Sequence, residues 1–278
     1  MSFARLPLGV SASFGCLVLL AIGSSVVGVV APAGPNVGDL AIRLQAPSLT
    51  PSASATHLLG TDHLGRDMLV RLLFSGGVSL IVSVSAVFLS CTFGTLVGLL
   101  AGYIGGRLDY VLMRVADIQL AMPFLALAVL ISAVLGPGLS NVIAVLAISG
   151  WVLYARVVRA SALTVRDLEY VWAARAIGAG PARIVLRTVL PNIFGPVVVM
   201  SSLAVSQMII AESSLSFIGL GVTPATPTWG TMLGDARSYL TVAWWVPTFP
   251  GIAITATVVA VNVIGDWLVD AMNPRLSR

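Results

Sequence analysis

Few residues of this sequence are of the types, or at the spacings, that carry out chemistry. His57 and His63 could ligate a metal, but no cluster of Cys, Asp or Glu completes a site, since Asp62 belongs to a separate motif. The chain contains no Lys, whereas a phosphate-binding loop needs one to reach the phosphates of a nucleotide. No nucleophile, base and orienting acid form a catalytic set. We therefore expect no catalytic residue, no bound metal and no ATP site in this chain.

A second group of polar residues falls in or beside an apolar stretch in the last third of the chain. Glu212 follows Pro191 by about 21 residues, which is roughly 31 Å of helix. We expect it near an outer membrane surface, as an interfacial or gate-supporting residue and not as a substrate ligand. Ser206 and Gln207 are candidates to line a water-filled pathway, together with Ser132, Asn141 and Ser201.

The elements that would position these residues are membrane helices. Hydrophobic residues make up 58% of the chain and charged residues only 9%, against about 25% charged in an ordinary soluble domain. Five stretches without Asp, Glu, Lys or Arg exceed the roughly 20 residues of a spanning helix: 6–38, 72–106, 118–155, 188–211 and 238–265. The third is cut by the helix-breaking Gly136-Pro137-Gly138 and therefore holds two spans.

The sequence thus predicts an all-α polytopic membrane protein with six transmembrane helices. We expect these at Leu8–Val30, Gly77–Ala101, Ile118–Leu135, Leu139–Ala155, Ile193–Ala211 and Phe249–Gly265. Ala31-Pro32-Ala33 resembles a signal-peptide cleavage site, but the preceding apolar run is longer than a signal core, so we expect a span. Cys16 and Cys91 fall inside spans, where a disulfide is not expected.

All basic residues are Arg, and their distribution predicts the orientation. If the N-terminus is cytoplasmic, most of the 15 fall on the cytoplasmic side, as the positive-inside rule requires. Those residues are Arg5, Arg107, Arg114, Arg156, Arg159, Arg166, Arg175, Arg183, Arg187, Arg275 and Arg278. Both termini are then cytoplasmic. The net charge of +4 reflects this topology and does not indicate a nucleic-acid partner.

Three segments between the spans are long enough to carry function. Residues 32–76 form an external loop, and residues 219–247 form a second one in which Trp229, Trp244 and Trp245 suit an interfacial aromatic belt. On the cytoplasmic side, periodicity predicts a surface helix over residues 165–177, a turn at 178–181, and a second helix from Ala182 to Leu190-Pro191. This segment is either a solvated linker or a contact surface for another protein.

The cytoplasmic segment resembles a known docking motif. Residues 172–178 read Trp-Ala-Ala-Arg-Ala-Ile-Gly, and after nine residues 188–191 read Thr-Val-Leu-Pro. This is similar to the EAA loop of the permease subunits of binding-protein-dependent ABC importers, which docks into a groove on the ATPase subunit. The matching residues are Ala173, Ala174, Gly178, Leu190 and Pro191. Trp172 stands where the family has Glu, and Thr188 where it has Ile; Glu169 or Arg175 are candidates to replace the ion pair of that Glu.

Two further stretches are similar to one branch of the family. An external motif, Gly60-Thr61-Asp62 followed by Gly65-Arg66-Asp67, resembles the one after the first span of the second permease in dipeptide and oligopeptide importers. The run Leu-Ser-Phe-Ile-Gly-Leu-Gly-Val at 215–222, with 227–230 and 273–275, resembles the C-terminal third of that subunit. These matches stand in the same order as in the family.

The resemblance implies a type I ABC importer permease with a cytoplasmic coupling helix between spans 4 and 5. Residues 1–31 would form the cytoplasmic tip and first span, 32–76 the external loop, and 77–278 the permease core with its EAA-like loop at 160–192. A second homologous permease, cytoplasmic ATPase subunits that carry ATP and Mg²⁺, and an external binding protein would complete the assembly in the inner membrane of a prokaryote. In this family the cargo ranges over di- and oligopeptides, nickel complexes and haem.

Two other functions remain open from the residues alone. A secondary transporter driven by an ion gradient would be expected to show matching halves and buried carboxylates near the membrane midplane, whereas the interiors of the expected spans contain no acidic residue. A membrane scaffold without transport activity is not excluded by hydropathy.

Overall fold

The computed structural model describes residues 7–30, 34–48, 57–223 and 225–272, and the regular elements of this part of the chain are all helices, without a strand. The all-α prediction is therefore confirmed. The long helices are α1 (Leu8–Val30), α2 (Met68–Ile104), α5 (Leu139–Arg166), α8 (Leu190–Phe217) and α10 (Trp245–Met272). The shorter α-helices are α3 (Gly106–Leu120), α4 (Phe124–Leu135), α6 (Glu169–Ala176), α7 (Pro181–Ile184) and α9 (Trp229–Ala236).

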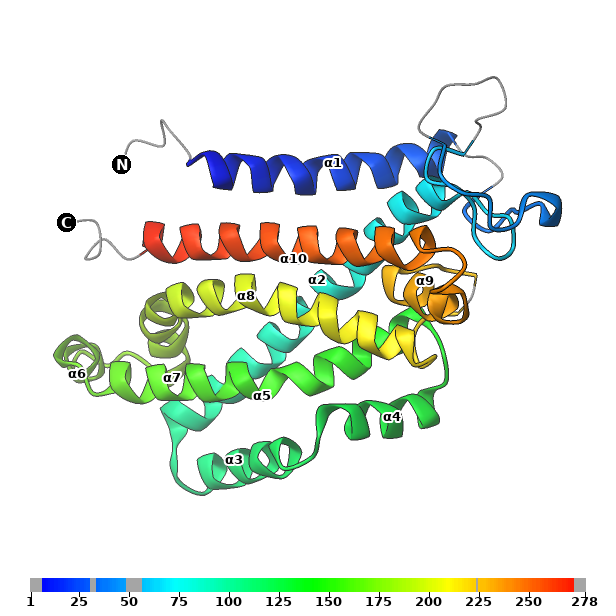
Figure 1. Cartoon of the computed structure of the whole chain (residues 1–278). Coiled ribbons are helices and arrows are strands. Elements are labelled where there is room, and N and C mark those ends of the chain that lie inside the picture. Colours follow the sequence, from blue (N-terminus) through cyan, green and yellow to red (C-terminus); the bar gives the residue numbers. More distant parts are fainter. Residues whose placement is uncertain (1–6, 31–33, 49–56, 224, 273–278) are drawn as a thin grey trace.

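The long helices form an elongated bundle with two distinct ends (Figure 1). Helices α1, α10, α8 and α5 run side by side, and α2 crosses behind them and packs most extensively against α5. One end carries α6 and α7, together with the start of α1 and the end of α10; we call it the α6 end. The opposite end, the α9 end, carries α9 and residues 34–48 and 57–67.

Glycines allow α2 and α5 to pack backbone against backbone. Gly94, Gly98 and Gly102 recur every four residues on α2, so they lie on one face of the helix. A Cβ at Gly98 would stand 2.6 Å from the Ala155 carbonyl oxygen, and one at Gly102 would stand 2.7 Å from that of Arg159. Small residues at such a spacing are what lets membrane helices approach closely. The pair α2–α5 is therefore a tightly packed unit that runs the length of the bundle.

Five helices are long and apolar enough to cross a membrane, and a bent pair, α3 with α4, would supply a sixth span. The predicted continuous span Ile118–Leu135 is wrong. Helix α3 begins at Gly106 and is bent by 96° from α4 at a break before Pro123, where the proline cannot continue a helix. Helix α4 alone has 12 residues, or roughly 18 Å at 1.5 Å per residue, which is shorter than a bilayer core.

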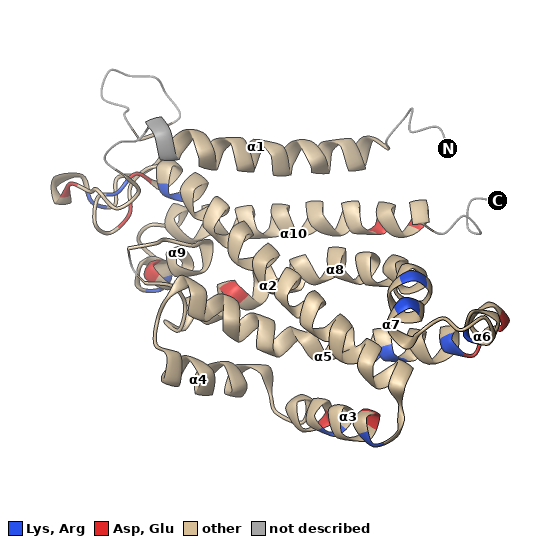
Figure 2. Cartoon of the chain, turned by 180° about the vertical axis from the view of Figure 1, so that it is seen from behind, with Lys and Arg blue, Asp and Glu red and all other residues tan. Residues whose placement is uncertain are grey.

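The charged residues of α3 explain why it does not continue in the direction of the apolar helix α4. Its Asp109 pairs with Arg159 of α5 at 2.5 Å, and its Asp117 pairs with Arg156 of α5, also at 2.5 Å. These ion pairs hold α3 against the half of α5 near the α6 end. Figure 2 shows that the basic residues gather around α6 and α7, and that a second group of charges lies at the α9 end.

The helices also begin and end elsewhere than predicted. Helix α2 starts at Met68, with Asp67 as its N-cap, so the predicted boundary of the external loop at residue 76 lies about two and a half turns too late. Helix α8 runs from Leu190 to Phe217 and exceeds the predicted Ile193–Ala211 at both ends. Of the three tryptophans that the sequence places in an interfacial belt, Trp229 is fully buried, Trp245 is buried and Trp244 is exposed.

Candidate functional site

At the α6 end, two short helices connect α5 to α8. The predicted single helix over residues 165–177 is wrong, because α5 continues to Arg166 and Asp167 breaks the chain before α6 begins at Glu169. Val165 therefore packs in the core as part of α5, whereas Leu168 is exposed. The buried position of α6 is Val171, which packs with Val158 and Ala162 of α5. We call residues 167–189 the α6–α7 segment.

The turn between α6 and α7 depends on Gly178. Its φ of +83° is a left-handed conformation that side chains rarely adopt, as the predicted turn requires. Pro181 then occupies the first turn of α7, where a missing N–H is tolerated. Residues Val185–Val189 form a π-helical turn that leads directly into α8, in which Leu190 is half-buried and Pro191 is exposed. A displacement of α7 is therefore transmitted to α8 without an intervening loop.

Arg175 is held between two aromatic rings. Its guanidinium carbon lies 5.2 Å from the centre of the Trp172 ring and 5.5 Å from that of Tyr103, which belongs to α2. Both distances are within the range of cation–π attraction, about 0.5–1 kcal/mol for an exposed pair. Trp172, which stands where the related loops have Glu, thus helps to attach α6 to α2. Within the described residues, Glu169 and Arg175 form no ion pair.

The outer face of the α6–α7 segment is unusually apolar for a solvent-facing surface. The large apolar residues exposed on it are Leu168, Tyr170, Trp172, Ile177 and Leu186, and Ile177 is 86% exposed. Ala173 is exposed beside them, and Ala174 is half-buried toward α5. Apolar side chains so placed indicate contact with another molecule.

At the α9 end, the external motif folds as two tight turns ahead of α2. Gly60 and Gly65 have φ values of +76° and +70°. A side chain at Gly60 would stand 2.5 Å from the Gln45 carbonyl oxygen, and one at Gly65 would overlap the backbone of Asp39. Thr61 connects the same two loop segments, because its hydroxyl donates to the Ile42 carbonyl and accepts from the Gln45 N–H. Both glycines are therefore required by the fold of the loop.

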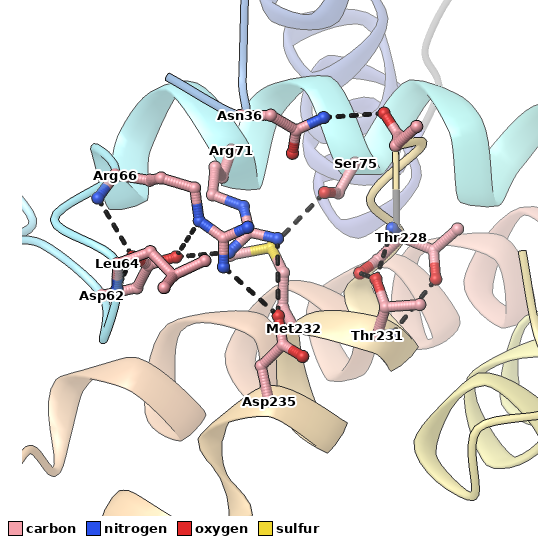
Figure 3. A network of polar contacts seen from close by, with 11 residues as sticks. Asn36, Asp62, Leu64, Arg66, Arg71, Ser75, Thr228, Thr231, Met232 and Asp235 are labelled. Carbon is pink, nitrogen blue, oxygen red and sulfur yellow. Dashed lines mark hydrogen bonds and ion pairs between the residues drawn. The ribbon is translucent and has the colours of Figure 1, made fainter. Parts of the chain in front are cut away.

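Asp62 is the centre of a buried ionic network (Figure 3). Its carboxylate accepts from Arg66 Nε at 2.6 Å and from the Arg71 guanidinium, and both arginines reach Asp235 of α9 at 3.4 and 3.6 Å. Burial raises the pKa of Asp62, but the Arg66 N–H, the charges of Arg71 and Arg66 and the Leu64 N–H outweigh it and hold that pKa below 3.8. The network ties the loop, α2 and α9 together.

Asp67 and the two histidines complete this end. Asp67 caps α2 by accepting from the Val70 N–H at 2.9 Å, and its other oxygen is bonded to His57 Nδ1 at 2.7 Å. His63 stacks on Tyr239, with 5.3 Å between the ring centres. In the described ranges, no three His, Cys, Asp or Glu side chains are grouped as metal ligands. Of the motif residues, Arg66 reaches Asp235, which no sequence pattern singles out.

Glu212 is fully buried within the chain and does not face the surface, and its predicted place near a gate stays a prediction. It accepts from Ser216 at 2.7 Å and from Ser79 of α2 at 3.2 Å, and the Ser79 oxygen in turn accepts from the Trp229 N–H. The Trp229 ring fills the space over Gly76 and donates its indole N–H to the Leu72 carbonyl. Glu212 thereby connects α8 to α2 and α9, a role that a solvated surface carboxylate could not have.

The two candidate pathway residues, Ser206 and Gln207, differ in their exposure. Ser206 is buried and donates to Asn262 of α10 at 2.7 Å, so within this chain it joins two helices. Gln207, the next residue, is exposed on α8. An exposed amide in the middle of a spanning helix requires a polar environment, either water or another protein. Gln207 therefore stays a candidate to line a pathway, whereas Ser206 contributes to packing.

Two solved structures with a similar arrangement of helices are ABC transporters. The inward-facing methionine transporter MetNI matches 70% of this chain and 94% of its own chain, with a TM-score of 0.53 at 20% identity. An amino acid ABC transporter matches 69% of this chain and 91% of its own, with a TM-score of 0.51 at 16% identity. At such identities the likeness concerns the fold alone. The fold is that of the permease of a type I ABC importer.

Sequence comparison gives the family. Residues 94–278 match the binding-protein-dependent transport system inner membrane component. The di/tripeptide transport system permease protein DppC of Pseudomonas aeruginosa is 44% identical over 90% of this chain and 82% of its own length. The glutathione transport system permease protein GsiD of Pectobacterium atrosepticum is 40% identical over 82% and 76%. The chain belongs to this family of multi-pass permease components of ABC importers, and it is not the ATPase.

Proposed function

We propose that this chain and a second, related permease together form the membrane pathway of an ATP-driven importer of small peptides. An external binding protein delivers the cargo, and cytoplasmic ATPase subunits bind ATP and Mg²⁺. The relatives support a peptide cargo, since they are named for transport of di- and tripeptides, dipeptides and glutathione, which is itself a tripeptide. The chain then sits in the inner membrane of a prokaryote.

The α6–α7 segment is the observation that carries this proposal. It projects from one end of the bundle and exposes a row of apolar side chains that includes Trp172 and Ile177. Val171 and the Arg175–Tyr103 contact hold it against α5 and α2, and the π-helical turn joins it to α8. A partner that moves this segment would therefore move three spanning helices at once, which suits the coupling of ATP-driven closure to transport.

The orientation follows from the charges. Arg166, Arg175, Arg183 and Arg187 lie at the α6 end, as do the start of α1 and the end of α10. By the positive-inside rule this end is cytoplasmic, so both termini lie in the cytoplasm and the α9 end faces outward. The ATPase subunits would then contact the α6–α7 segment, while the binding protein would approach the external motif.

Co-purification tests the docking surface. We expect Ile177→Asp to reduce the amount of ATPase subunit that co-purifies with this chain several-fold, because a charge would replace an exposed apolar contact. Leu40→Asp is a matched control, since Leu40 is 65% exposed at the other end of the molecule. Equal recovery of ATPase with both variants would exclude this docking surface. Peptide uptake that needs an ion gradient but no ATP would instead exclude the importer.

A further inference from the structure

A cavity of about 540 Å³ opens at the α9 end, between elements that are far apart in the sequence. The turn after Asp62, the end of α8 and the helix α9 contribute most of its wall, and Pro137 from the α4–α5 turn closes one side. Its volume is within the roughly 300–1,000 Å³ of pockets that bind small molecules. Apolar residues such as Leu64, Phe217 and Val222 share the wall with charged ones.

The charges on this wall are not balanced. Three guanidinium groups line the cavity, those of Arg66, Arg71 and Arg237, and the carboxylates within reach are those of Asp62 and Asp235. Both of these carboxylates already form ion pairs with Arg66 and Arg71. Arg237 donates to the Phe217 carbonyl oxygen at 2.9 Å and lies over the Phe217 ring at 4.7 Å. Among the described residues it has no carboxylate partner, so one positive charge remains uncompensated.

A buried donor on the same wall also lacks a partner. Arg71 is only 2% exposed, and its Nε has no hydrogen-bond acceptor in the part of the chain that the structure describes. The Nδ1 atom of His63 is likewise buried without a partner. Burial lowers the pKa of His63 below 6.5, so the ring adds no charge at neutral pH. Buried donors are normally satisfied, and a guanidinium is suited to bind a carboxylate with two parallel hydrogen bonds.

We propose that this cavity binds the C-terminal carboxylate of the peptide cargo as it enters the permease, with Arg237 as the residue that binds it. The proposal rests on the proposed function for its cargo. Asp62 and Asp235 compensate Arg66 and Arg71, so the charge that attracts the carboxylate is that of Arg237, and the apolar residues contact the peptide's side chains. A free carboxylate is common to all unmodified peptides, so a site of this kind selects the class of cargo without reading its sequence.

Binding measurements on the permease complex test this site. The complex, purified with its ATPase subunits and without the binding protein, is titrated with a dipeptide and with the C-terminal amide of the same dipeptide. We expect the amide to bind about tenfold more weakly, which corresponds to one lost charged hydrogen-bonded contact. Arg237→Gln should weaken binding of the acid to the level of the amide and leave binding of the amide unchanged. Arg237→Lys, which keeps the charge, should retain part of the preference.

Arg43→Gln is the control, because Arg43 is exposed at the same end and does not line the cavity. It should bind the acid as the wild type does. The proposal is overturned if acid and amide bind equally, if the wild-type complex binds neither, or if Arg237→Gln leaves affinity for the acid unchanged. A separate titration of the complex with the purified binding protein gives a further test: if Arg237→Gln weakens docking of that protein and leaves peptide binding unchanged, the proposal is overturned, since the cavity would then receive an acidic side chain of that protein. ATP-dependent uptake by the wild type tests the proposed function separately.

Discussion

Asp62 is 1% exposed, and it accepts hydrogen bonds from two guanidinium groups and from the N–H groups of Leu64 and Arg66. Asp62→Asn would remove the charge and leave Arg66 and Arg71 buried with only Asp235. Breaking a buried ion pair on one side costs about 3–5 kcal/mol. We therefore expect the variant to detach the loop before α2, which faster proteolysis at residues 57–67 would report. Normal protection of the loop would contradict the role given to Asp62.

The same network predicts a pH dependence. The folded pKa of Asp62 is below its ordinary value of 3.8, so the stability that the carboxylate contributes is present above that value and is lost as the pH falls through the folded pKa. Proteolysis of the loop in the wild type should therefore stay slow at pH 5 and rise below about pH 3.8. Asp62→Asn should show no further rise over that range. A wild-type transition centred above pH 5 would point to another group.

Glu212 gives a second prediction at the scale of single residues. Glu212→Ala would leave the Ser79 and Ser216 hydroxyl protons without an acceptor and open space beneath Trp229. We expect the unfolding free energy to fall by about 1–3 kcal/mol, seen as a lower midpoint of thermal unfolding in detergent. Glu212→Gln keeps the shape and should lose less. Ser214→Ala is the control on the same helix, because Ser214 is exposed and bonds only within α8. An Ala variant as stable as the control would exclude the connection.

At the scale of elements, the sequence predicted the helices and the turns between them better than their ends. Apolar length reveals a span, and left-handed glycines such as Gly178 reveal a turn, because both are local properties. The burial of Trp229 and Glu212 depends on contacts between α2, α8 and α9, which no local pattern contains. The bend between α3 and α4 could not be predicted for a similar reason. The carboxylates that hold α3 at an angle to α4 form ion pairs with arginines of α5, which are distant in the sequence. Likewise, no sequence pattern predicts that Asp235 pairs with Arg66 of the external motif.

The packing of α2 on α5 predicts a contrast between two glycines. Gly98→Ala places a methyl group 2.6 Å from the Ala155 carbonyl oxygen, so the helices must separate. We expect a loss of about 1–3 kcal/mol, the usual cost of overpacking, measured as a lower thermal midpoint. Gly251→Ala lies in α10 in open space and should be neutral or slightly stabilising, since Ala favours a helix. Equal midpoints for both variants would show that α2 and α5 are not in backbone contact.

At the scale of the whole molecule, the two ends are joined by helices that run the full length of the bundle. The chain from Pro181 to Phe217 passes as one apolar helical stretch from the α6 end to Glu212 and the wall of the cavity. Helix α2 likewise begins beside Asp62 and ends beside Tyr103, which contacts Arg175. A movement of the α6–α7 segment therefore has two continuous routes to the α9 end, both carried by helices that pack closely.

Gly178 tests whether the α6–α7 segment acts as a rigid connection. At a φ of +83° a β-branched side chain is strained by roughly 1–2 kcal/mol, so Gly178→Val should change the angle between α6 and α7. We expect ATP hydrolysis to continue while peptide uptake per ATP falls several-fold. Gly178→Asn is the matched control, because Asn adopts left-handed conformations more readily and should retain most of the coupling. A Val variant that assembles with its ATPase and transports at the wild-type ratio would show that the segment bends freely, and that force reaches α8 by another route.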